Sequence, residues 1–86
     1  MAITSAQVTC GATEAALNTA STRWMKLTVR NSHATDALLL GPTGVSATSF
    51  ALAAGGTLTI DLSPGTVVYG LRGASNDITA HVLRVA

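Results

Sequence analysis

The stretch from Thr57 to Leu71 reads TLTIDLSPGTVVYGL, two β-type segments around one turn. Its first six residues alternate polar and apolar side chains, and this period places Leu58, Ile60 and Leu62 on one buried face of a strand. The next four residues, Ser-Pro-Gly-Thr, predict a type II turn, because proline presets φ at the second position and glycine accepts the positive φ of the third. The last five residues predict a further strand, so the stretch indicates a β-protein.

Strand signals of the same kind recur on both sides of this stretch. Met25, Leu27 and Val29 alternate with polar residues, and the same alternation runs through Ile78 and Val82 near the C-terminus. Further predicted strands cover residues 3–8 (an edge strand), 38–40 and 46–52. Short strands at a spacing of ~8–12 residues are typical of sandwiches and barrels. The sequence therefore predicts an all-β fold, a small antiparallel β-sandwich resembling a jelly roll.

Residues 13–17, Thr-Glu-Ala-Ala-Leu, carry the one ambiguous signal. Their intrinsic propensity is helical, and a single helical turn is one interpretation. We expect a strand instead, because the strand at residues 23–31 needs an antiparallel neighbour and tertiary context often overrides propensity.

Length and composition indicate one small domain that depends on contacts with other proteins. The chain has 86 residues, and we expect residues 1–86 to form a single sandwich with residues 1–9 as a docking arm or edge strand. Charged residues make up 10%, well below the roughly 25% of a typical soluble domain, so small neutral side chains must cover the surface. Cys10 is the single cysteine, which excludes an internal disulfide and leaves assembly as the expected source of extra stability.

Charge and hydropathy argue against nucleic-acid and membrane partners. The net charge is +1, the five basic residues do not cluster, and only three residues are aromatic, whereas a nucleic-acid groove needs a basic face with stacking rings. No signal peptide is visible, and no apolar run approaches the ~20 residues of a membrane helix. The lone cysteine fits synthesis in a reducing bacterial cytoplasm.

Side chains of catalytic or metal-binding type are scattered along the sequence: Cys10, Glu14, His33, Asp36, Asp61, Asp77 and His81. No two acids lie near each other, and two distant histidines with one cysteine do not match the spacing of a zinc site. No base is positioned beside the cysteine to activate it, so we expect a small buried residue there. The sequence predicts no enzyme activity, no cofactor, no metal and no small-molecule substrate.

Trp24 allows two interpretations. Alternation places it opposite Met25, so it packs on the second face or under a loop, or it is an exposed anchor of an interface, where tryptophan is enriched. Arg23 and Arg30 belong to the same predicted strand and are candidates for contacts at the rim of such an interface.

The order of strands and turns resembles small structural proteins of tailed bacteriophages. The resemblance covers about residues 10–85 and rests on these segments: Arg23–Asn31, Leu38–Gly41, Gly44–Ser46, Leu52–Leu58, Val68–Leu71 and Ile78–Val85. It implies a virion protein with a β-sandwich fold, either a capsid decoration (minor capsid) protein, often a trimer seated between capsomers, or a domain of a head fibre or tail. The partner implied is the major capsid protein, and the location implied is the capsid surface of the virion.

Three function classes follow from these observations. The first is a decoration protein that binds the assembled phage head, with an N-terminal arm of Ala2, Ile3, Thr4 and Ser5 as a docked or exchanged strand. The second is a structural domain of a tail or head fibre. The third, a carbohydrate-binding module, is weakly supported, because such a module needs exposed aromatic platforms and the chain has few aromatic residues.

Overall fold

A computed structural model describes residues 3–45 and 49–85 of the chain. Strands account for all the regular structure of these residues, and no helix among them is long and apolar enough to cross a membrane. The described strands are β1 (Ile3–Cys10), β2 (Ala15–Ala16), β3 (Met25–Asn31), β4 (Leu38–Gly41), β5 (Phe50–Leu52), β6 (Thr57–Leu62), β7 (Tyr69–Arg72) and β8 (Ile78–Val85).

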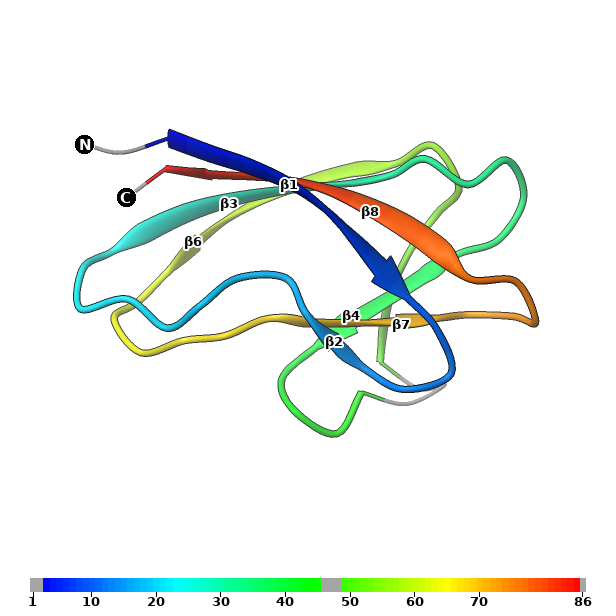
Figure 1. The fold of residues 1–86 in the computed structure, drawn as a ribbon, viewed down its shortest axis with the longest axis horizontal. Helices are drawn as coiled ribbons and strands as arrows, with labels where there is room; N and C mark the ends of the chain where they lie inside the picture. The colour runs from blue at the N-terminus through cyan, green and yellow to red at the C-terminus, as the bar shows by residue number, and fades with distance from the viewer. Residues whose placement is uncertain (1–2, 46–48, 86) are drawn as a thin grey trace.

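The strands form two four-stranded antiparallel sheets packed against each other (Figure 1). Sheet A has the order β1-β8-β3-β6, and sheet B has the order β2-β7-β4-β5. Eight strands shared between two sheets in this way make a jelly roll. The predicted all-β antiparallel sandwich is confirmed.

The predicted alternation gives the inward faces of the central strands. Leu27 and Val29 of β3 are fully buried, and Val29 lies opposite Val82 of the neighbouring β8. On the edge strand β6, Leu62 is buried, whereas Leu58 and Ile60 are only partly covered. The reason is that one flank of β6 has no neighbouring strand.

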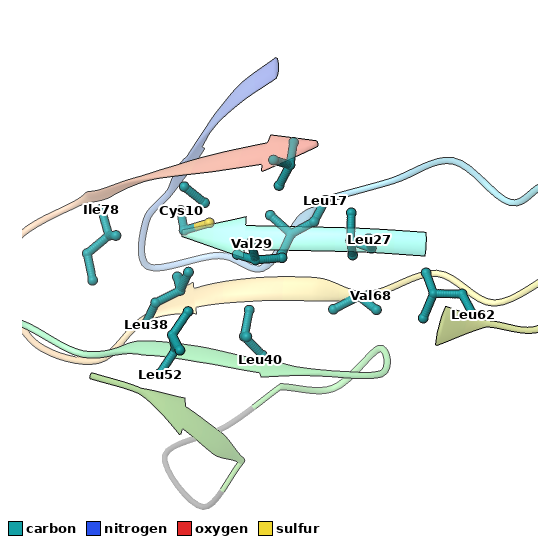
Figure 2. Packing of buried hydrophobic residues seen from close by; sticks show 12 residues of the cluster. Cys10, Leu17, Leu27, Val29, Leu38, Leu40, Leu52, Leu62, Val68 and Ile78 are labelled. Carbon is teal, nitrogen blue, oxygen red and sulfur yellow. The ribbon is translucent and has the colours of Figure 1, made fainter. Parts of the chain in front are cut away.

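Between the sheets, aliphatic side chains from both layers meet in one cluster (Figure 2). Leu38 and Leu40 of sheet B and Leu27 and Val29 of sheet A all point into it. Gly70 of β7 allows the two layers to approach closely, because a Cβ there would come within 2.8 Å of the Cys10 sulfur.

The predicted type II turn at residues 63–66 is present, and it connects the two sheets. Gly65 has a φ of 83°, and the amide of Thr66 donates to the carbonyl of Ser63 at 3.1 Å, as in a type II turn. The strands before and after it do not pair with each other, because β6 belongs to sheet A and β7 to sheet B. The turn therefore carries the chain from one sheet to the other.

Three local expectations are corrected by the structure. The strand expected at residues 13–17 exists as the short β2, but it pairs with β7 and not with β3, whose two edges are already occupied by β6 and β8. The strand expected at 67–71 begins at Tyr69. The strand expected at 46–52 is present over Phe50–Leu52, and residues 46–48 lie outside the described residues.

Candidate interaction surface

Titratable side chains do not converge on a reactive centre in the described part of the chain. No group of three His, Cys, Asp or Glu side chains there is placed to hold a metal ion. Arg72 and Asp77 form an ion pair at 2.8 Å, between two partly exposed side chains at the turn before β8. His33 has a structural role, since its Nδ1 accepts hydrogen bonds from the amides of Thr35 at 3.2 Å and Asp36 at 2.9 Å.

Cys10 is enclosed between the sheets at the end of β1 and is fully buried, as predicted. Burial raises the pKa of its thiol to about 11, so the group is uncharged at neutral pH. A neutral, enclosed thiol is a poor nucleophile and a poor metal ligand.

Glu14 ties the segment before β2 to the loop after β4. Its carboxylate accepts hydrogen bonds from the amides of Gly44 at 2.9 Å and Val45 at 3.2 Å, and from the hydroxyl of Thr43 at 3.0 Å. Desolvation raises the pKa of Glu14, but the bonds from Val45, Thr43 and Gly44 together outweigh it and hold that pKa below its ordinary value. Glu14 is therefore a negative charge fixed at this loop.

The outer face of sheet A carries three of the predicted interface residues, Ile3, Ser5 and Arg30; we call it the sheet A face. Strand alternation and register assign to it Ile3, Ser5, Gln7 and Thr9 of β1, Lys26, Thr28 and Arg30 of β3, Thr57, Thr59 and Asp61 of β6, and Thr79, His81, Leu83 and Val85 of β8. Short hydroxyl side chains dominate, and Thr28 and Thr59 share a hydrogen bond of 3.0 Å across neighbouring strands. Charged side chains on this face are few: Lys26, Arg30 and Asp61.

One end of the sheet A face is apolar. Ile3 is 66% exposed and pairs with Val85 across β1 and β8, and Leu83 in the next row is 42% exposed. Trp24, which is 67% exposed, directly precedes β3 at this same end, where Lys26 pairs with Val85. β1 and β8 run side by side to this end (Figure 1).

The middle of the sheet A face is hollowed and polar. Arg30 lies opposite His81 on one side and opposite Thr57 on the other, and Gln7 completes the row across the sheet. These side chains, with Ser5, line a shallow depression of about 480 Å³. Hydroxyl, amide, imidazole and guanidinium groups there can donate hydrogen bonds to backbone carbonyls of a partner protein.

The predicted interface residues are thus partly brought together. Ile3, Ser5 and Arg30 share the sheet A face, and Trp24 lies at its end, because β8 lies between β1 and β3. Thr4 points to the opposite side of β1 by alternation.

Two predicted positions remain outside this surface. Arg23 is exposed before β3, with its amide donating to the Ser21 hydroxyl at 3.1 Å, and Ala2 lies outside the described residues.

A second apolar feature, which the sequence reading missed, lies between the sheets along β5 and β6; we call it the β5–β6 groove. It has a volume of about 450 Å³ and its walls are almost entirely apolar, with Val29, Leu40, Phe50, Leu58, Ile60 and Val67 among the lining residues. Phe50 lies opposite Leu40 on the core-facing side of β5, yet it is 58% exposed. The signal available in the sequence was Phe50 itself, a large aromatic residue on a strand of only three residues.

Comparison with known proteins adds one likeness in fold. No family model and no curated protein matches the chain. Among solved structures, it is similar to a protein from Bacillus endospore appendages, which are described as a novel family of disulfide-linked pili, with a TM-score of 0.64 and 15% identity over 96% of this chain and 81% of that chain. An identity this low shows a shared fold alone.

Proposed function

We propose that this protein is a structural subunit that acts by docking onto protein surfaces, and specifically that it is a capsid decoration protein of a tailed bacteriophage. In this proposal it is made in the bacterial cytoplasm and binds the major capsid protein on the surface of the assembled head. The observation that carries the proposal is the sheet A face, an exposed surface with few charged side chains and with Ile3 and Leu83 exposed at one end. The chain has no catalytic role in this proposal.

The physical basis is thermodynamic linkage. A protein that binds the assembled shell and not its free subunits stabilises the shell by mass action. Small neutral side chains such as Thr28 and Thr59 lose little conformational entropy on burial, so a contact over this face is favourable without any strong single site. Assembly as a trimer would multiply each weak contact through effective concentration.

The test is the copy number of the protein in purified phage particles, measured by quantitative mass spectrometry against the major capsid protein. A ratio near one, or a simple fraction of one, supports decoration of the whole shell. A handful of copies would assign the protein to a tail, a head fibre or a unique vertex. Absence from the particle would contradict the phage assignment.

A filament subunit outside the cell is the second candidate, because the protein of similar fold comes from pili. A pilus of disulfide-linked type would need an accessible thiol, and the buried Cys10 does not supply one in this fold. Filament growth would therefore have to be non-covalent. Electron microscopy of the purified, concentrated protein distinguishes the two, since regular filaments support this candidate and discrete small particles support decoration.

A further inference from the structure

The β5–β6 groove marks the side on which the sandwich is not closed. It is bordered by the two edge strands β5 and β6, each of which has a neighbour on one flank only. Phe50, Leu58 and Ile60 face inward by register, yet no strand of the described chain covers them on that side. A concave site lined by apolar side chains is the usual form of a binding site in proteins.

The walls of the groove define the chemistry of its occupant. None of the lining residues is charged, and Thr66 is the one lining side chain that carries a hydroxyl. An occupant must therefore be apolar, since a charged group would lose its hydration without gaining a partner. The volume of about 450 Å³ exceeds by far the roughly 30 Å³ that one water molecule occupies in the liquid, and it accommodates a large aromatic side chain.

Trp24 is an exposed apolar side chain of the size and chemistry that the groove can receive. It is the single tryptophan of the chain, it is 67% exposed, and it is not part of the hydrophobic cluster. An indole buries about 150–250 Å² when it enters a pocket, and it carries one N–H that needs an acceptor there. The Thr66 hydroxyl and the carbonyl groups on the free flanks of β5 and β6 are acceptors of this kind.

We propose that the β5–β6 groove of one copy of this chain receives Trp24 of a second copy. The inference rests on the proposed function, a protein that acts through docking, and it names a partner for Trp24. Of the four large apolar side chains that are exposed in the described part of the chain, Trp24 is the largest and Phe50 belongs to the groove.

Charge complementarity supports a second copy as the occupant. Arg23 adjoins Trp24, and its exposed guanidinium makes no ion pair within residues 3–45 and 49–85. At the groove, Pro42 forms part of the wall, and the Glu14 carboxylate is held against the amides of Gly44 and Val45 in the same loop. Trp24 in the groove brings the cation of one copy to the side on which the other carries a fixed anion.

The symmetry of this contact is heterologous, because the tryptophan and the groove are different patches of one chain. Each copy then offers one Trp24 and one groove, so contacts propagate from copy to copy. Such a chain of contacts either closes into a ring, of which a trimer is the smallest common case, or grows into a filament.

The first test uses Trp24 as its own probe. Fluorescence of the purified full-length chain is recorded during dilution, together with the mass by light scattering. We expect the emission to move to longer wavelength as oligomers dissociate, because the indole returns to water. Phe50→Glu, at a side chain already 58% exposed, places a charge in the groove and should raise the dissociation constant by at least about thirtyfold. Ser75→Glu, which adds the same charge at an exposed turn residue between β7 and β8, is the control and should leave the dissociation constant unchanged.

The second test distinguishes this contact from a symmetric one. Trp24→Ala keeps the groove and Phe50→Glu keeps the tryptophan, so each variant alone should be a monomer with the circular dichroism of the wild type. Mixed together, they should form a dimer that grows no further, because only one productive contact remains. A wild-type chain that is monomeric up to about 1 mM, the range of the weakest specific contacts, would overturn the inference, as would a mixture that stays monomeric.

These results separate the inference from the proposed function. Self-association through Trp24 in a protein that is absent from phage particles would support the inference and contradict capsid decoration. A protein that is monomeric in solution but present on the shell in a simple ratio to the major capsid protein would support capsid decoration and contradict the inference.

Discussion

Cys10 lies at the end of β1 with its side chain fully buried between the sheets. Burial raises the pKa of the thiol to about 11, so about one thiol in a thousand is ionised at pH 8. We expect the native protein to react with dithiobis(nitrobenzoate) at least about a hundredfold more slowly than the unfolded chain, since only the exposed thiolate attacks. Absorbance of the released thiolate measures both rates, and equal rates would show that Cys10 is accessible.

Asn31, the last residue of β3, is a buried polar residue whose role the sequence analysis did not anticipate. Its side-chain amide donates to the carbonyls of Asp36 at 2.9 Å and Leu52 at 3.0 Å, and its Oδ1 accepts from the His33 amide at 3.0 Å. Because Asn31 has no exposed surface, Asn31→Ala would leave these groups without partners.

We expect the Asn31→Ala change to lower the free energy of unfolding by about 1–3 kcal/mol. Urea denaturation measures the loss. The matched control is Asn76→Ala, at an exposed asparagine whose amide reaches only the exposed Asp36 carboxylate at 3.2 Å. The control should change stability by less than about 0.5 kcal/mol, and an equal effect of the two substitutions would contradict the role of the buried amide.

At the scale of elements, the contact between β1 and β7 sets how closely the two sheets approach. Gly70 faces Cys10 across the core, and a Cβ at position 70 would lie 2.8 Å from the Cys10 sulfur and 3.5 Å from the nearest atoms of Leu17 and Leu38. Gly70→Ala should therefore cost about 1–3 kcal/mol of stability through overpacking.

The Cys10→Ala change removes the sulfur and should restore about 1 kcal/mol or more in the double variant, even though it is mildly destabilising alone. A double-mutant cycle by urea denaturation measures this coupling. If the stability losses of the two single variants simply add in the double variant, the side chains at positions 10 and 70 are not energetically coupled.

The sequence predicted the positions of most strands, but it did not predict which strands pair with each other in each sheet. The inward faces of β3, β6 and β8 follow from alternation, which depends only on neighbouring residues. The partner of β2 was wrong, because sheet order depends on which edges other strands have already occupied. Leu39 illustrates the limit: a run of three leucines predicts a buried strand, but it does not say which strands will flank it.

On the scale of the whole molecule, the N-terminal strand connects the fold to the proposed docking surface. Within the described residues, Ile3, Thr4 and Ser5 pair with Val85, Arg84 and Leu83 of the same chain. The arm therefore contributes the outer edge of the sheet A face, including the exposed Ile3.

Deletion of residues 1–5 should lower the occupancy of the protein on phage particles by about tenfold or more, which corresponds to a loss of about 1.4 kcal/mol per contact. Occupancy is measured by quantitative mass spectrometry after the particles are loaded with each variant. Thr13→Ala, at an exposed residue between β1 and β2, is the control, and its occupancy on the particles should equal that of the wild type. Unchanged occupancy of the deletion variant would exclude the arm from docking.

The sequence by itself determined the fold class, the inward faces of β3, β6 and β8, and the turn at Gly65. Each of these depends on a local period or on the conformational range of single residues, which the order of amino acids specifies directly. Only the tertiary structure decided that Ile3, Leu83 and Arg30 share one face, and that the sandwich stays open along β5 and β6. Ile3, Leu83 and Arg30 share a face because β8 pairs with both β1 and β3, and the groove is open because β5 and β6 are the last strands of their sheets. Such pairings between separate segments are selected by which apolar faces cover one another.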